Sequence, residues 1–255
     1  MRIDQYEKMY KIQNTHWWFV GKADIVEDVI NRRAGGQADR RTILDIGCGT
    51  GLMLGRLSKY GNAYGIDHSA EAVKFSSRVL NGRVKQGALP DRIPFNDGEF
   101  DLITALDVLE HIDDDVASVK TLYRLLKPHG LAIVTVPAYM HLWSNHDMVL
   151  EHKRRYTKRH LMTLFDNREW QIEKATYFNT LLYPPILLIR TLNKLFHPNR
   201  FETDDAPPSR FMNAIFYGVM RFEMKWLRRG NLPLGVSVLI SARKKTESVK
   251  TFELP

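Results

Sequence analysis

The sequence predicts an α/β fold: a doubly wound, mostly parallel sheet of seven strands with a helical insertion between the last two. Short apolar runs alternate with helical patterns between residues 42 and 136, which is typical of a sheet covered by helices on both faces. Residues 171–178 and 235–242 alternate in polarity like strands and complete the seven. More than fifty residues separate these two, where a compact fold usually has a short connection.

The elements follow one another in a regular order. A helical lead-in over residues 1–33 precedes a polar linker. The expected strands are 42–46, 62–67, a short one near Val84, 100–105, 131–136 and the two later ones; the expected helices include 51–59, one starting near Ser69, and 113–126. This order divides the chain into a helical lead-in or lid at 1–41, a core at 42–178 and 234–244, an insertion at 179–233 and a tail at 245–255.

Composition narrows the class of protein. The 255 residues are 44% hydrophobic and 26% charged, as in an ordinary globular protein. A single cysteine, Cys48, excludes an internal disulfide and fits a reducing compartment. The opening residues do not resemble a signal peptide, and the longest apolar run, 181–189, is too short to span a bilayer. We therefore expect a cytoplasmic protein, and the net charge of +8 predicts an anionic partner.

The most informative segment is a glycine-rich turn at the end of the first strand. Its sequence is Leu44-Asp45-Ile46-Gly47-Cys48-Gly49-Thr50-Gly51. Glycines allow the backbone to approach a ligand closely because they lack a Cβ atom. Asp67 ends the next strand, so its carboxylate is expected in the same crevice. The spacing differs from the dinucleotide pattern G-x-G-x-x-G, whose last position would be Leu52.

Together with other segments, this turn resembles the class I S-adenosylmethionine-dependent methyltransferases, which have a Rossmann-like fold. The remaining segments of the resemblance are Gly65-Ile66-Asp67, Ile93-Pro94-Phe95 with Phe100-Asp101, Asp107-Val108-Leu109-Glu110-His111-Ile112 and Leu125-Leu126-Lys127-Pro128. The stretches Trp143–Asp147 and His152–Thr157 resemble a subgroup of polysaccharide, glycolipid and polyprenyl pathways.

The resemblance implies a role for each matching residue. Asp45, Gly47, Cys48 and Gly49 would border the methionine and ribose of S-adenosylmethionine, and Asp67 would accept hydrogen bonds from both ribose hydroxyls. The other cofactor positions are His68, Ala88 and Leu89 near the adenine, and Asp107 and Val108 near the sulfonium. Many relatives have an acidic or polar side chain at the position of Ala88 or Leu89, and this chain has none.

Methyl transfer requires a nucleophile in line with the sulfonium and, where needed, a base that removes a proton. His146 and His152 are the preferred candidates because the segment after the fifth strand faces the cofactor in such folds; His111 is a further candidate. For each histidine, a structural hydrogen bond is the alternative. The histidine and acid spacings match no standard metal motif, so no metal is expected.

Acceptor contacts are expected from three segments. Trp17 and Trp18 form either a lid over the acceptor or part of the core. Asp147 is a candidate base and substrate residue. Arg154, Arg155 and Tyr156 are candidate anchors for a substrate phosphate, because a guanidinium binds phosphate through two hydrogen bonds; a solvated charge run with Lys158 and Arg159 is the alternative. In the insertion, one predicted helical stripe is apolar and another is basic. The apolar stripe is Phe211, Ile215, Val219, Phe222 and Trp226, and the basic one contains Arg210, Tyr217, Arg221, Lys225 and Arg228.

These observations favour methyl transfer to a lipid, lipid-linked glycan or isoprenoid acceptor, at oxygen, with peripheral membrane contact through residues 179–233 on the inner face of the membrane. One alternative is a small-molecule methyltransferase whose insertion forms a lid or a homodimer interface. Another is a cofactor-binding scaffold without catalysis. No nucleic-acid partner is expected, because the basic residues are mixed with bulky apolar ones.

Overall fold

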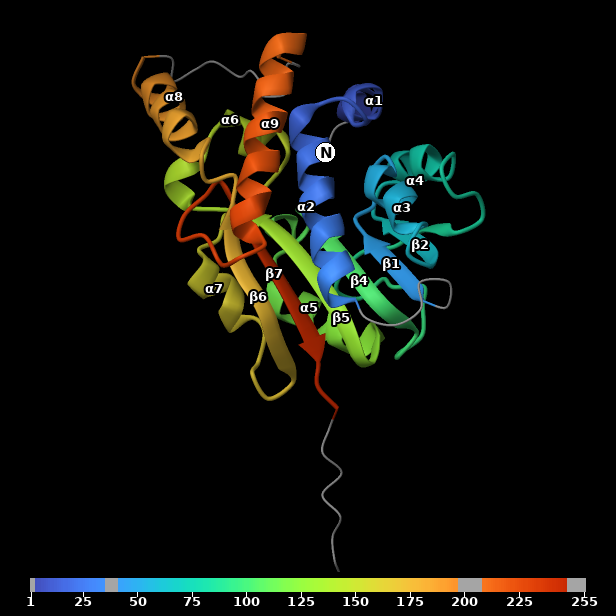
Figure 1. Cartoon of the computed structure of the whole chain (residues 1–255). Helices are drawn as coiled ribbons and strands as arrows, with labels where there is room; N and C mark the ends of the chain where they lie inside the picture. Colours follow the sequence, from blue (N-terminus) through green and yellow to red (C-terminus); the bar gives the residue numbers. More distant parts are fainter. Residues whose placement is uncertain (1–2, 35–40, 197–207, 247–255) are drawn as a thin grey trace, which may run out of the picture.

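A central sheet of seven strands organises the molecule (Figure 1), whose computed structural model describes residues 3–34, 41–196 and 208–246. The strand order is β3-β2-β1-β4-β5-β7-β6. The strands are β1 (Thr42–Ile46), β2 (Asn62–Asp67), β3 (Val84–Gln86), β4 (Phe100–Leu106), β5 (Leu126–Pro137), β6 (Trp170–Phe178) and β7 (Ser237–Lys244). Five strands run parallel, and β7 pairs antiparallel with both β5 and β6. The predicted fold class is confirmed.

Helices cover both faces of this sheet. They are α1 (Ile3–Ile12), α2 (Trp17–Arg33), α3 (Leu52–Leu57), α4 (Ala70–Ser76), α5 (Asp115–Leu125), α6 (Asn145–Val149), α7 (Lys158–Thr163), α8 (Tyr183–Phe196) and α9 (Arg210–Leu227), with short 3-10 turns η2 (Leu109–His111) and η3 (Met140–Leu142). Buried residues of α5 and α7 form one apolar core against the sheet. Those of α2, α3 and α9 form a second core on the other face.

The boundary between α5 and β5 differs from the prediction. Asp114 caps the helix by accepting a hydrogen bond from the backbone N–H of Ala117, so α5 starts at Asp115 and not at residue 113. Strand β5 begins directly after it at Leu126, and its pairing with β4 shifts between Phe100 and Leu102. Lys127–Gly130, expected as a stop between helix and strand, therefore lies inside an irregular first part of β5.

Helix α9 of the insertion is a structural part of the domain. It packs along α2 (Figure 1), and Met220 and Leu227 belong to the second core. The close packing needs Gly21, because a Cβ atom there would lie 2.7 Å from the sulfur of Met220. The side chain of Asn213 bonds to the chain at both Thr15 and Trp17. We expected other helices to cover both faces of the sheet without the insertion. Instead, α9 packs with α2 and α3 over one of these faces.

Helix α8 is attached differently. None of its described residues is buried, whereas Glu223 of α9 holds the chain that leads into it. The buried Glu223 carboxylate accepts hydrogen bonds from the backbone N–H groups of Asn179, Thr180 and Leu181 at 2.5–3.0 Å. Within the described residues, no helix is both long and apolar enough to cross a membrane. The predicted tail falls almost wholly on residues 247–255, outside the described part.

We predict that Glu223→Ala destabilises the fold by about 3 kcal/mol, because it leaves several backbone N–H groups without an acceptor. For a domain of this size, such a loss lowers the Tm by roughly 6–12 °C in a thermal unfolding experiment. Glu71→Ala is the matched control: Glu71 pairs with Lys74 at the exposed surface of α4, and its loss should change the stability by less than about 0.5 kcal/mol. Equal Tm values for the two variants would contradict the prediction.

Candidate functional site

The glycine-rich turn after β1 lies against the residues that follow β4. Gly47, Gly49 and Gly51 have φ values of +67°, +53° and +93°, a region that residues with a side chain rarely adopt. A Cβ atom on Gly47 would lie 2.5 Å from Cγ2 of Val108. Two strand ends that are far apart in sequence therefore meet at one edge of the sheet, as the resemblance implied for a cofactor site.

Asp67, at the end of β2, connects the turn to the second strand. One oxygen of its buried carboxylate accepts a hydrogen bond from the Gly49 N–H at 3.0 Å, and the other accepts one from Ser69 N–H at 2.9 Å. The exposed His68 ring lies beside it, with Nδ1 3.3 Å from Oδ1. Ala88 and Leu89 follow β3, the next strand outward. Asp67, His68, Ala88 and Leu89 thus lie at or after the carboxyl ends of two neighbouring strands, β2 and β3.

Asp45 and Cys48 are both buried in the turn. Asp45 accepts a hydrogen bond from the Thr104 hydroxyl at 2.6 Å, and burial raises the pKa of this carboxyl to about 7. A nearby positive charge on a ligand would favour its ionised form. Burial also raises the pKa of the Cys48 thiol, so the thiol stays protonated at neutral pH. This supports the interpretation of Cys48 as a small packing residue of the turn, not as a nucleophile.

Asp107, directly after β4, forms an ion pair that the sequence analysis missed. Its carboxylate lies 2.5 Å from Nζ of Lys22 on α2 and accepts a hydrogen bond from Thr135 at 2.9 Å. Burial alone would raise the pKa of Asp107, but the Lys22 ammonium outweighs it and lowers the pKa below its usual value. Lys22 interrupts the apolar pattern of its helix, and that interruption is the signal that could have identified it.

Helix α1 closes over the turn from the outside. The side chains of Gln13 and Thr50 bond to each other at 2.6 Å, and a Cβ atom on Gly49 would lie 3.3 Å from the methyl of Met9. Tyr6 is buried against Ala72 and Phe75 of α4. The lead-in helix thus lies over the cofactor segment, whereas Trp17 and Trp18 do not. Trp17 packs on Phe216 of α9 and Trp18 stacks on Phe178, as core packing predicts.

His152 is held by a buried carboxylate. Its Nδ1 lies 2.8 Å from Oδ1 of Asp147, which sits in α6 and also binds the guanidinium of Arg155 through both oxygens, at 2.7 and 2.9 Å. Burial would raise the pKa of Asp147, but the hydrogen bonds from His152 and Arg155 hold it well below its usual range. Because an ionised carboxylate only accepts hydrogen bonds, Nδ1 is the donor of this hydrogen bond. Asp147 therefore orients the His152 ring.

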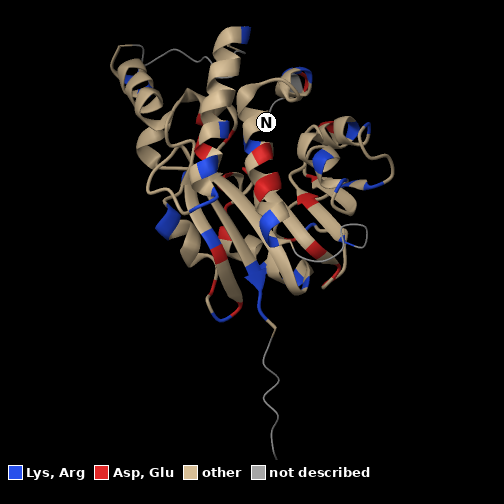
Figure 2. Cartoon of the chain, in the orientation of Figure 1, with Lys and Arg blue, Asp and Glu red and all other residues tan. Residues whose placement is uncertain are grey.

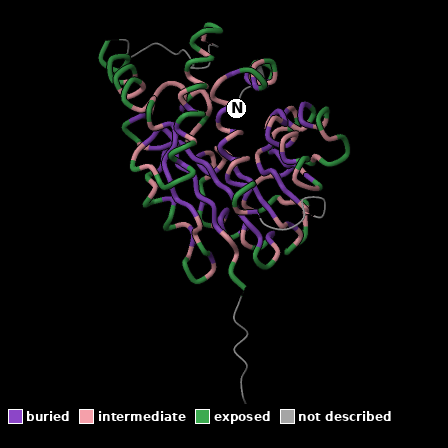
Figure 3. The backbone as a smooth tube through the Cα atoms, in the orientation of Figure 1, coloured by how far each residue is buried: buried purple, intermediate pink, exposed green. Residues whose placement is uncertain are grey.

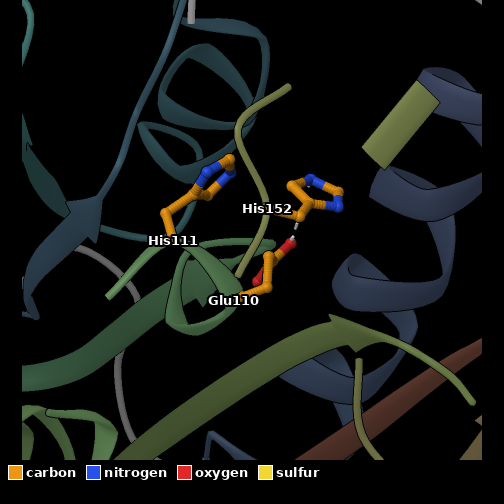
Figure 4. Close-up of side chains that lie close together, drawn as sticks. All are labelled: Glu110, His111 and His152. Carbon is orange, nitrogen blue, oxygen red and sulfur yellow. Dashed lines mark ion pairs between the residues drawn. The ribbon is translucent and has the colours of Figure 1, made fainter. Parts of the chain in front are cut away.

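Glu110 and His111 lie next to His152 at the end of β4 (Figure 4). The Glu110 carboxyl is fully buried, and neither oxygen has a hydrogen-bond partner among the described residues. Nε2 of His152 lies 4.0 Å from Oε1 of Glu110. Burial, with the charge of Asp107, raises the pKa of Glu110 well above its usual value. Burial also lowers the pKa of His111 to about 4, so its ring is neutral at pH 7.

Among the described residues, Glu110, His111 and His152 each offer one donor atom, and the three atoms lie within 4.8 Å of one another. A carboxylate and two imidazoles are donors that a divalent transition metal accepts, although the sequence spacing predicted no metal. The same three groups form an acid–base cluster without an ion. The sequence analysis did not assign Glu110 a role, because its importance depends on His152, which is 42 positions away in the chain.

Two residues expected to bind substrate have structural partners instead. Arg155 is buried, and its guanidinium is occupied by Asp147 and by the backbone oxygen of Ala138. Tyr156 is also buried, and its hydroxyl donates to Asp115 at 2.9 Å. In this arrangement neither can bind a substrate phosphate, so that expectation is wrong for them. Asp147, which was also expected to contact substrate, is hydrogen-bonded to His152 instead. His146 lies nearby, with its ring centre 6.5 Å from that of His152.

Comparisons with known proteins agree with this geometry. Residues 44–134 match the family described as a methyltransferase domain. Over 99 residues the chain is 34% identical to a ubiquinone biosynthesis O-methyltransferase of Methylococcus capsulatus, covering 35% of this chain and 40% of the relative. Over 128 residues it is 27% identical to an uncharacterized methyltransferase of Mycobacterium sp., covering 47% of this chain and 51% of the relative. The chain spans about half or less of the length of these curated relatives.

Solved structures share the fold over almost the whole chain. A methyltransferase in complex with the Trm112 activator of Haloferax volcanii aligns with a TM-score of 0.61 and 17% identity, covering 95% of each chain. A SAM-dependent methyltransferase from Thermotoga maritima aligns with a TM-score of 0.58 and 17% identity, covering 95% of this chain and 96% of its own. Residues 44–134 thus match a methyltransferase domain by sequence, the chain shares the fold of the solved methyltransferases, and S-adenosylmethionine is the cofactor.

We predict that S-adenosylmethionine raises the Tm of the wild-type protein and that Asp67→Ala abolishes this shift. The variant loses the carboxylate that is positioned for the ribose and that holds Gly49 of the turn. Asp91→Ala is the control, because Asp91 is an exposed acid in the loop after β3, and its cofactor-dependent shift should stay as in wild type. A full shift in the Asp67 variant would contradict the assigned role.

Proposed function

We propose that this protein transfers a methyl group from S-adenosylmethionine to an oxygen of a lipid, lipid-linked glycan or isoprenoid acceptor at a membrane surface. The single observation that supports this most is the exposed apolar surface of α8 and α9 beside the segment that carries His152. The reaction moves a methyl group from sulfur to oxygen, and the acceptor's hydroxyl proton must leave to a base.

His152 is the base in this proposal. The side chain is 6% exposed, and Asp147 fixes the tautomer in which Nε2 can accept a proton. The imidazolium that forms lies between two carboxyl groups, Asp147 at Nδ1 and Glu110 near Nε2. Arg155 is a positioning residue, since it touches Asp147 and not the reacting atoms. The same logic orients the histidine of hydrolase triads, where a buried carboxylate selects the tautomer.

The acceptor class follows from the surface of the two insertion helices. On α8, the exposed apolar residues are Leu188, Ile189, Leu192, Leu195 and Phe196; on α9 they include Phe211, Ile215, Phe222 and Trp226. Leu195, Phe196 and Phe211 are 69–73% exposed. Figure 3 shows α8 and the first turns of α9 as the exposed end of the molecule. The predicted apolar stripe of α9 thus points to solvent, while Met220, Glu223 and Leu227 face the core.

Charge selects an anionic lipid surface as the partner of these apolar faces. Within α8 and α9, the only acid is Glu223, which is buried. Basic residues lie on both helices (Figure 2): Arg190 and Lys194 of α8 donate to backbone oxygens of η3, and Arg210, Arg221 and Lys225 of α9 are exposed. An amphipathic helix with bulky apolar residues beside Arg and Lys binds the headgroup region of anionic membranes.

The names of several relatives support an oxygen as the methyl acceptor. They are ubiquinone biosynthesis O-methyltransferases, which are named for methylation at oxygen and for an isoprenoid-type product. Two alternatives remain open: a small-molecule enzyme that uses α8 and α9 as a lid or homodimer interface, and a scaffold without catalysis. The His152–Asp147 pair favours catalysis over the scaffold.

We expect His152→Asn to lower kcat by about 100-fold or more, the usual contribution of a general base, while the cofactor-induced Tm shift stays. The measurement is transfer of labelled methyl from S-adenosylmethionine into the lipid-soluble fraction of a membrane extract. His160→Asn is the control, because His160 lies on the exposed face of α7. Label confined to water-soluble products would exclude a lipid acceptor, and wild-type turnover in the His152 variant would exclude its role as base.

We expect the protein to sediment with phosphatidylglycerol vesicles. A smaller fraction should sediment at high salt, because salt screens the attraction between basic side chains and anionic lipid headgroups. Leu192→Asp combined with Phe211→Asp should reduce the bound fraction about tenfold, since both residues are exposed on the apolar faces. Val116→Asp is the control: Val116 is an apolar residue on α5, on the other face of the sheet, and its exposure of 46% is close to the 42% of Leu192. Recovery of the wild type in the supernatant with and without vesicles would contradict membrane binding.

A further inference from the structure

We propose that contact of α8 with an anionic lipid surface activates the enzyme by fixing the segment that carries Asp147 and His152. This inference rests on the proposed function, because it assigns a regulatory role to the membrane contact proposed there. The structure connects the exposed helix to the base through contacts that can be followed residue by residue.

The first link joins α8 to the chain after β5. Tyr183, Arg190 and Lys194 lie on one side of α8, at spacings of seven and four residues. The Tyr183 hydroxyl is 2.8 Å from Nε2 of His141, Lys194 donates to the His141 backbone oxygen at 3.0 Å, and Arg190 donates to the Leu142 oxygen. The inner side of α8 thus binds η3, while its outer side is apolar.

The second link joins η3 to the base. Ser144 follows η3 after one residue and caps α6, with its backbone N–H donating to Asp147 at 2.8 Å. Asp147 then holds Nδ1 of His152. Arg155 binds this segment at both ends, because its guanidinium contacts Asp147 and the Ala138 oxygen. A displacement of η3 therefore changes the position of Asp147 and, with it, of His152.

The third observation is that α8 is weakly held in the absence of a partner. It has no buried residue, and its attachments include the polar contacts with η3, the ring contacts of Tyr183 with Tyr139 and His141, and the chain at its start. Glu223 holds residues 179–181, which lead into α8, through three backbone hydrogen bonds. The rest of α8 is held by hydrogen bonds to η3 near the surface. Elements with few buried apolar contacts open at low free energy. Burying the outer apolar side in lipid would stabilise α8 where it binds η3.

The test is hydrogen exchange of backbone amides in residues 139–152, with and without phosphatidylglycerol vesicles, on the full chain with S-adenosylhomocysteine. With accessible lipid at about ten times its Kd, we expect exchange of this segment to slow about tenfold. In Arg190→Gln combined with Lys194→Gln, vesicles should still bind, but the slowing should be lost. Methyl transfer into the lipid fraction, measured in parallel, should rise with vesicles in the wild type and not in this variant.

The matched control is Arg221→Gln combined with Lys225→Gln, which removes two positive charges from α9 without touching η3. Compared at lipid concentrations that give equal bound fractions, this control should keep the wild-type slowing of exchange. Vesicle binding without any slowing, or equal slowing in the Arg190 and Lys194 variant, would overturn the coupling and leave the membrane function standing. Absence of vesicle binding would instead overturn the membrane part of the proposed function.

Discussion

The carboxylate of Asp147 is the interaction on which the acceptor half of the site depends. A buried negative charge is costly unless it is paired and hydrogen-bonded, and Asp147 is completely buried. Its partners come from three places in the chain: Ser144 at the start of α6, His152 after it, and Arg155 beyond. Because these partners offset the cost of the buried charge, they hold parts of the segment from 138 to 156 together, with Nε2 of His152 4.0 Å from Oε1 of Glu110.

The cofactor half is constrained by backbone geometry instead. Gly47 contacts Val108 so closely that a methyl group would not fit, and Asp67 ties the Gly49 N–H to the second strand. The buried acids there are balanced by one cation, Lys22, supplied by α2. Since α2 is fixed in turn by α9, through Gly21 and Met220, the insertion also supports the cofactor side. The two halves of the site are therefore joined through the same helix pair.

This difference explains what could be predicted from the sequence. The strands and the cofactor turn depend on local patterns, an apolar run followed by glycines and an acid, and the structure confirms the sheet they predicted. His129 illustrates the limit of the local rules, because it adopts φ +62°, a region that residues with a side chain rarely occupy. The roles of Arg155, Tyr156, Lys22 and Glu110 depend on contacts between distant segments. The sequence pattern of an arginine followed by a tyrosine does not distinguish a phosphate-binding arginine from one that is paired with a buried aspartate.

The insertion shows why an apolar stripe alone does not say which side of a helix is buried. On α9 the large apolar residues Phe222 and Trp226 are exposed, while an acid, Glu223, is buried between two core positions. Hydrophobic burial alone would rotate this helix the other way. The observed orientation holds because Glu223 satisfies three backbone N–H groups before α8 and because Asn213 and Gly21 fit the surface of α2. The apolar residues this orientation leaves outside need a partner, and the exposed basic residues of α9 favour an anionic one.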